Sequence, residues 1–129
     1  MKANELMIGD WVQDLCPVVI DAVSNEDVCT YRTDNGYITA NPSNLKPIQI
    51  TPEILEKNGF TEKGYHYHIS NDYYGLFISE VTDSIWKINY YNHESSAFDG
   101  CVCVAYIHEL QHAIRLWRLT EIADNFKVE

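Results

Sequence analysis

The segment Val104–Leu119 constrains the fold more than any other part of the sequence. It is the one long stretch in which apolar residues recur with a helical period. On a helix that advances about 100° per residue, its apolar side chains fall within one arc of roughly 120°. These side chains are Ile107, Ile114, Leu110, Trp117, Tyr106 and Ala113. We therefore expect a helix over about 105–118 with this face turned toward a core.

The same segment contains the string H-E-L-Q-H, which matches the H-E-x-x-H pattern of zinc peptidases. In such a site His108 and His112 would bind Zn²⁺, and Glu109 would be the general base acting on the metal-bound water. The third protein ligand would have to come from Glu121 or Asp124, shortly after the helix. This reading makes the chain a small zinc metallohydrolase.

Three features favour a structural interpretation of the string. The helical arc places both histidines away from the apolar face, toward solvent. Arg115 lies on the same face, one turn from His112 and two turns from His108, and a fixed cation there disfavours a bound dication. Arg115 and Arg118 also stand where the extended metzincin pattern has Gly and His. We therefore interpret the string as a solvated polar helix face with no catalytic, cofactor-binding or metal residue, and keep the zinc enzyme as the alternative.

Residues 1–50 have the pattern of a small all-β subdomain. Asn35-Gly36 is a strong two-residue hairpin signal, because both turn positions need a positive φ. Short strands separated by tight turns predict an SH3-like barrel or a rolled sheet. The expected strands are Trp11–Asp14, Val18–Val23, Asp27–Thr33, Tyr37–Ala40 and Leu45–Ile50.

Residues 51–129 predict an α+β subdomain. Thr51-Pro52-Glu53 opens a short bridging helix over 52–58, because Thr caps and Pro fits the first helical position. From Gly64 the apolar period becomes two, which predicts strands over about 65–104. We expect an antiparallel meander covered by the helix at 105–118. The fold class is therefore α+β, with subdomains 1–50 and 51–129 or one compact unit.

Other groupings of chemically active residues have weaker support. His66 and His68 alternate on one strand face and could bind a metal with His93, although a half-buried sheet commonly has such a polar face. Cys101 and Cys103 could be combined with the helix histidines into a zinc site, but their spacing is not that of a zinc finger. We treat the four cysteines as reduced, small apolar residues.

Composition limits the partners. The net charge of −10 makes binding to a nucleic-acid backbone or an anionic membrane unfavourable, and a protein partner fits better. Nine tyrosines, many within 65–91, could stack on single-stranded nucleic acid, but ordinary sheet propensity explains them. The start of the chain does not have the pattern of a signal peptide, and no apolar run reaches membrane-spanning length. We expect a cytoplasmic protein.

Three segments resemble a group of short, uncharacterised proteins of gut Bacteroides-type bacteria, often encoded near prophages and mobile elements. They are Met1–Val12 (MKANELMIGDWV), Leu45–Phe60, and Tyr106–Leu116 (YIHELQHAIRL) with the following Leu119–Phe126. In that group Gln can replace the Glu, and Asn the second His, of the helix string. The resemblance implies a bacterial or phage setting and a helix retained for packing, and it carries no activity or site residue.

Together these patterns predict a non-enzymatic accessory or protein-interaction protein. The first alternative is the zinc metallohydrolase built on the helix string. The second is a nucleic-acid-binding module that uses the N-terminal barrel. Substrate, partner and oligomeric state are not specified by the sequence.

Overall fold

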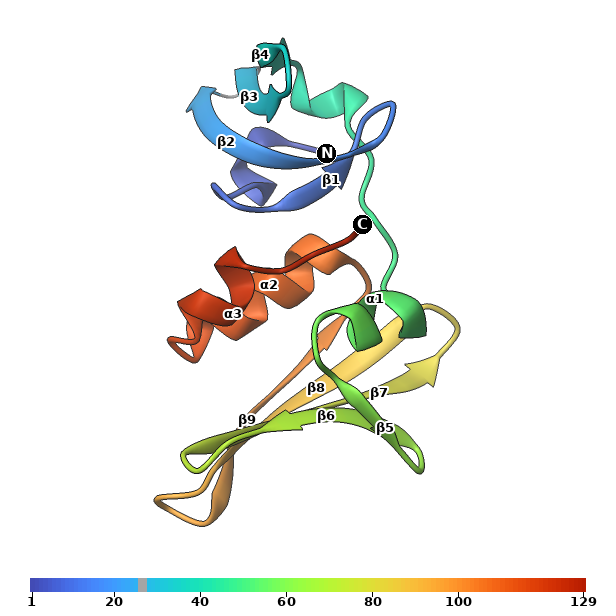
Figure 1. Cartoon of the computed structure of the whole chain (residues 1–129), viewed down its shortest axis with the longest axis vertical. Coiled ribbons are helices and arrows are strands. Elements are labelled where there is room, and N and C mark those ends of the chain that lie inside the picture. Colours follow the sequence, from blue (N-terminus) through green and yellow to red (C-terminus); the bar gives the residue numbers. More distant parts are fainter. Residues whose placement is uncertain (26–27) are drawn as a thin grey trace. The chain divides into compact units, whose positions relative to one another are not determined.

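The computed structural model describes residues 1–25 and 28–129. Two antiparallel sheets and a few short helices make up the chain, as expected for an α+β protein (Figure 1). The chain divides into two compact units, and the first joins Met1–Ile48 to Tyr106–Glu129. The second is Gln49–Ala105. This grouping differs from the expected division after residue 50, which assigned the C-terminal helix to the second half.

The first unit contains a four-stranded sheet in the order β1-β2-β3-β4. Four of the predicted strands are present, and the predicted hairpin joins β3 to β4. Its two-residue turn is Asp34-Asn35 and not Asn35-Gly36: Gly36 has a positive φ (+118°) but pairs with Thr33 as the first residue of β4, and Asn35 does not have the predicted positive φ. Asp27, predicted as the start of a strand, lies outside the described residues. The bounds are β1 (Trp11–Gln13), β2 (Pro17–Asn25), β3 (Val28–Thr33) and β4 (Gly36–Ala40).

The SH3-like barrel is not confirmed, because this sheet does not close. The predicted closing strand, Leu45–Ile50, is not formed, although Lys46 makes an isolated bridge with Gln13. It follows a short 3₁₀ turn at Pro42–Asn44, and Pro47 has no N–H to donate to a ladder. The chain therefore leaves the sheet where a barrel would need another full strand.

The core of this sheet is apolar, with one polar pair at its margin. The Tyr31 hydroxyl donates to the Asp14 carboxylate, and this bond together with burial raises the pKa of Tyr31 to about 12. The phenol therefore stays protonated at all ordinary pH values. The buried core residues are Leu6, Val12, Val18, Ile20, Cys29, Tyr31 and Leu45.

Two helices complete the first unit. α2 (Ile107–Leu116) lies within the predicted range, and α3 (Thr120–Asp124) follows beside it (Figure 1). α2 also packs against β1. Four apolar residues of the predicted arc are buried, as expected: Ile107, Leu110, Ala113 and Ile114.

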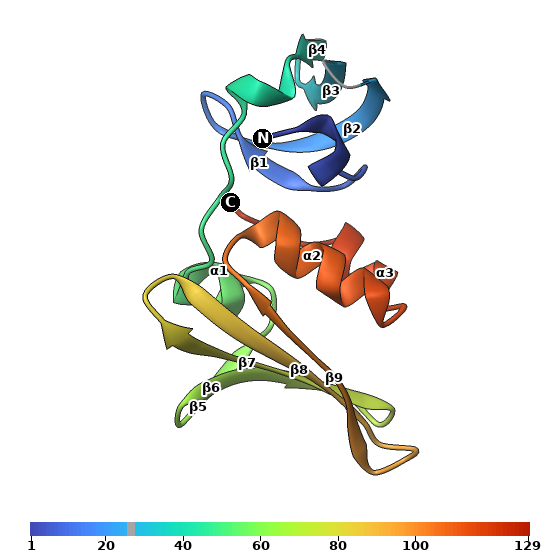
Figure 2. The ribbon, with the colours of Figure 1, turned by 180° about the vertical axis from the view of Figure 1, so that it is seen from behind.

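The second unit begins with α1 (Pro52–Lys57), whose first turn is capped as predicted: the Thr51 hydroxyl accepts from the Ile54 N–H. A five-stranded antiparallel meander follows, and Figures 1 and 2 show α1 lying over one face of it. The predicted strands are present, with one additional edge strand. The bounds are β5 (Thr61–Lys63), β6 (His66–Ser70), β7 (Tyr74–Thr82), β8 (Ile85–Asn92) and β9 (Ala97–Val104).

The two faces of the β5–β9 sheet differ in exposure. One face carries buried apolar side chains, among them Leu76, Ile78, Trp86, Ile88 and Val104. The other, which we call the open face, carries side chains that are half-buried or exposed. They are Thr61, Lys63, His66, His68, Ser70, Phe77, Ser79, Lys87, Asn89, Tyr91, Phe98, Cys101 and Cys103.

Among the described residues, no helix has both the length and the apolar character that a membrane span needs.

Candidate functional site

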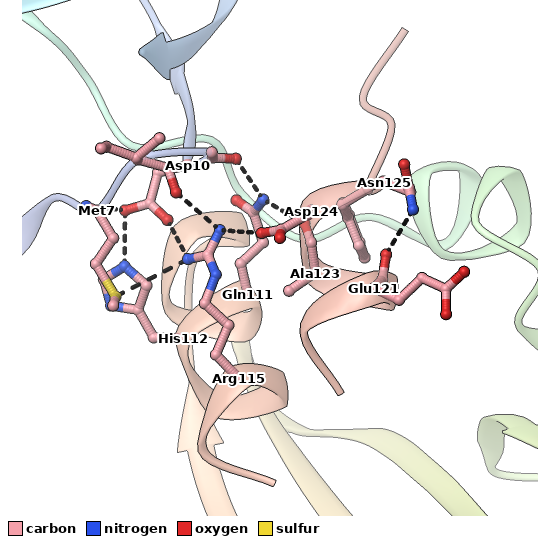
Figure 3. A network of polar contacts seen from close by, with 12 residues as sticks. Met7, Asp10, Gln111, His112, Arg115, Glu121, Ala123, Asp124 and Asn125 are labelled. Carbon is pink, nitrogen blue, oxygen red and sulfur yellow. Dashed lines mark hydrogen bonds and ion pairs between the residues drawn. The ribbon is translucent and has the colours of Figure 1, made fainter. Parts of the chain in front are cut away.

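The polar side of α2 binds a buried carboxylate, Asp10, at the start of β1 (Figure 3). His112 Nε2 lies 2.7 Å from one oxygen of Asp10, and Arg115 Nη1 lies 2.8 Å from the other. The backbone N–H of Met7 donates to the oxygen shared with His112, at 2.7 Å. A carboxylate only accepts, so His112 carries a proton on Nε2. Asp10 therefore ties the N-terminal segment to α2 through two side chains.

Arg115 extends the same network to the backbone. Its Nη2 lies 3.3 Å from the Ile8 carbonyl oxygen and 3.5 Å from the Asp124 carboxylate. Gly9 has a φ of +93°, and a Cβ there would lie 2.9 Å from Arg115 Nη2. Glycine is therefore required at position 9 both for the backbone conformation and for the close approach of the guanidinium.

Gln111 is fully buried and has all of its principal hydrogen bonds satisfied by backbone groups. Its Oε1 accepts from the Trp11 N–H at 2.9 Å. Its Nε2 donates to the carbonyl oxygens of Gly9 at 2.8 Å and Ala123 at 3.0 Å. The amide thus links β1, α2 and α3, and we call Asp10, Gln111, His112 and Arg115 the polar clamp.

The predicted solvent-facing orientation of the two histidines is wrong. His108 is buried and His112 is half-buried, with the ring centroids 5.7 Å apart. The helical arc assumed one packing surface for α2, whereas α2 is covered on its polar side too. Gln111, His112 and Arg115 can be covered because Asp10 and backbone groups satisfy their polar atoms, which removes most of the cost of burying them. His108 differs, because its Nδ1 is buried and has no hydrogen-bond partner within the described part of the chain.

The other residues proposed for a zinc enzyme have different positions and partners. The Glu109 carboxylate accepts from the Tyr106 N–H at 3.1 Å, across the first turn of α2. Glu121 is exposed on α3, and its carboxylate points away from His112 (Figure 3). Asp124 binds Arg115 instead of completing a histidine site. The structure therefore does not bring the residues together as a metal site.

Within the described residues, no group of three or more His, Cys, Asp or Glu side chains is arranged to hold a metal ion. His66 and His68 do share the open face, with ring centroids 5.9 Å apart. All four cysteines are free thiols, and only Cys29 is buried. The prediction that the cysteines serve as small core residues therefore holds for Cys29 and is wrong for the exposed Cys16, Cys101 and Cys103.

Asp10 and Gln111 belong to the site but were not predicted from the sequence. Both lie in segments that carry the resemblance described above, at opposite ends of the chain. The structure brings these segments together, because residues near position 10 contact residues near position 111. The resemblance at both ends of the chain therefore pointed to the segments that form the site. A single sequence, however, does not show that these two segments are in contact.

A pH-dependent contribution to stability follows from His108. Burial lowers the pKa of its imidazole, against the opposing effects of the Asp10 and Glu109 carboxylates. The folded state therefore binds a proton less readily than the unfolded state, whose His pKa is about 6.5. The contribution of the neutral His108 imidazole to the free energy of unfolding is fully present above the unfolded pKa of about 6.5. It is lost as the pH falls below that pKa.

We expect His108→Phe to remove this pH-dependent term. Phe keeps an aromatic ring beside Tyr106, whose ring stacks on His108 at 6.0 Å, but it cannot bind a proton. The measurement is urea unfolding of the wild type and the variant between about pH 7.5 and pH 5. The wild type should lose more stability than the variant across this interval. Parallel pH profiles for the two proteins would contradict the assignment.

A scan with protein-family models and searches of curated proteins and of solved structures found no match to this chain.

Proposed function

We propose that the chain is a non-enzymatic accessory or protein-interaction protein of the bacterial cytoplasm or of a phage-derived element. One observation carries the proposal: three polar residues of the H-E-L-Q-H string, Glu109, Gln111 and His112, are engaged in contacts that hold the first unit together. Glu109 accepts at the helix start, and Gln111 and His112 bind the N-terminal segment. A hydrolase would need the acid and both imidazoles directed toward a metal and its water.

The zinc alternative conflicts with the local charges and contacts. A dication bound by His112 would have to replace the hydrogen of Nε2 that faces Asp10, or use the other ring nitrogen. It would also lie close to the Arg115 guanidinium, which repels it. Glu121 would have to leave its present orientation to become a ligand. These contacts support a structural role for the string.

The test uses His112→Gln, because the Gln Nε2 matches the position of the His Nε2 and can donate to Asp10, whereas an amide is a poor zinc ligand. We expect this variant to fold with a loss of stability of about 1 kcal/mol or less, since one hydrogen bond replaces another. We also expect zinc or EDTA to leave the melting temperature of both proteins unchanged, because a ligand shifts stability only by binding the folded state. Calorimetry and metal analysis of purified protein give both readouts.

Stoichiometric zinc in the wild type, absent from His112→Gln, would reverse the proposal. A melting temperature that falls when EDTA is added to the wild type alone would do the same. Glu109→Gln is the companion variant: it retains an acceptor for the Tyr106 N–H and removes the acid that a metallohydrolase requires. In the accessory role this variant behaves like the wild type.

A further inference from the structure

The open face of the β5–β9 sheet carries a continuous series of rings, which we call the ring row. The row runs through His66, His68, Phe77, Phe98, Tyr91 and His93. Successive ring centroids along it lie 5.0 to 6.1 Å apart. The row crosses four neighbouring strands and the loop after β8. Aromatic and imidazole rings on one sheet face provide the surface on which unpaired bases stack.

The charge on this face differs from that of the whole protein. Lys63 and Lys87 lie at ladder positions of the open face and are exposed. The ladder positions of this face, all within the described part of the chain, hold no carboxylate. Glu62 and Glu80 pair with Tyr67 and Trp86 and so belong to the opposite face. The paired positions of the open face therefore carry positive charge on an otherwise acidic protein. Two exposed carboxylate residues follow members of the ring row in sequence: Glu94 after His93, and Asp99 after Phe98 at the irregularity in β9.

We propose that the open face binds single-stranded nucleic acid, with bases stacked on the ring row and phosphates near the two lysines. Most neighbouring rings of the row meet edge to face, so bases would stack on individual exposed ring faces. A ring face accepts every base, so the recognition is tolerant of sequence. A second copy of this chain is a poorer occupant, because face-to-face association would bring lysines together and each chain carries a net charge of −10. This inference goes beyond the proposed function and does not depend on the polar clamp.

The net charge and the small number of lysines make the expected interaction weak and only mildly dependent on salt. Two phosphate contacts give a slope of log K against log salt of about −1.4 for a single strand. A protein that relies on a basic groove has a much steeper slope. A shallow slope combined with dependence on rings is therefore the signature of this site.

The experiment is fluorescence anisotropy of a labelled mixed-sequence DNA single strand of about 12 nucleotides, titrated with the full chain at several salt concentrations. We expect Phe98→Ala to weaken binding about 5- to 150-fold, as removal of one stacking platform does. Phe98 is 63% exposed, so its truncation leaves the fold intact. Lys87→Gln should reduce the magnitude of the salt slope by about 0.7.

Tyr37→Ala is the matched control, because Tyr37 is an equally exposed strand aromatic (65%) on β4 of the other sheet. It should leave binding unchanged. The proposal is overturned if the wild type fails to bind at low salt, or if Tyr37→Ala weakens binding as much as Phe98→Ala. Equal competition by polyglutamate would assign the face to an acidic polypeptide. Self-association in sedimentation that Phe98→Ala abolishes would assign it to a second copy.

Discussion

Asp10→Asn should destabilise the first unit by about 3–5 kcal/mol, the range seen when one partner of a buried ion pair is removed. Asp10 is fully buried, and the Arg115 side chain that binds it is only 11% exposed. The substitution leaves a guanidinium that is largely shielded from water and has lost its principal counter-charge. The free energy of unfolding of a native domain is only about 5–15 kcal/mol, so the expected loss is a large fraction of the total stability. Urea unfolding measures it.

Asp124→Asn is the control for this prediction, since Asp124 contacts the same guanidinium at 3.5 Å but is 60% exposed. An exposed pair of this kind contributes about 0–1 kcal/mol. We also expect Arg115→Gln in the Asp10→Asn background to cost less than it does in the wild type, because the two residues are coupled. If the Asp10 and Asp124 variants lost equal stability, the buried carboxylate would not hold the first unit together.

Gln111→Glu should cost about 3–5 kcal/mol, although the two side chains have nearly the same shape. The amide nitrogen that donates to Gly9 and Ala123 would become an oxygen facing two carbonyl oxygens. A negative charge would also be placed where the native side chain is fully buried. Chemical denaturation at neutral pH gives the size of the loss.

The pH dependence of the stability of the Gln111→Glu variant tests whether the new carboxyl group is buried. Burial raises the folded pKa of a new carboxyl above its unfolded value of about 4.3. The unfolded state then ionises first, so the variant should recover stability relative to the wild type as the pH falls toward that value. A variant that merely repacked the surface would show no such recovery.

Glu109→Gln completes the comparison, since it exchanges an acid for an amide two residues away on the same helix. We expect a change within about 1 kcal/mol, because the amide oxygen still accepts from the Tyr106 N–H. A metallohydrolase would depend on Glu109 and tolerate change at position 111. The polar clamp predicts the opposite: Gln111→Glu is strongly destabilising and Glu109→Gln is nearly neutral. A larger loss from Glu109→Gln than from Gln111→Glu would refute the polar clamp.

Local patterns predicted the elements well where the relevant contacts are near in sequence. The cap at Thr51 and the hairpin signal at Asn35-Gly36 depend on neighbours within a few residues. The cap is confirmed, and the hairpin is present with its two-residue turn displaced by one residue, to Asp34-Asn35. Alternation correctly placed His66 and His68 on one strand face. The helix containing Leu110 was identified by its apolar period, and its ends were displaced by about two residues, which is usual.

The site was mispredicted because its contacts span most of the chain. Trp11 and Gln111 are 100 residues apart, and no local pattern pairs them. A helical arc sorts side chains by polarity and treats polar ones as solvated. Gln111 contradicts that rule, since backbone groups satisfy its buried amide. His108 contradicts it as well, because it is buried although its Nδ1 has no hydrogen-bond partner among the described residues. The prediction that the N-terminal sheet closes into a barrel failed for a similar reason. Whether two strands pair depends on residues far apart in sequence, which local patterns do not reveal.

The order in which the chain is made has a consequence for the first unit. Its final segment, Tyr106–Glu129, is translated after all of Gln49–Ala105, so Asp10 and Trp11 leave the ribosome long before their partners exist. At about 5–20 residues per second this interval lasts several seconds. During it the nascent N-terminal strands lack their covering helices. Premature termination near residue 105 would leave that surface permanently uncovered, a form suited to capture by chaperones or proteases.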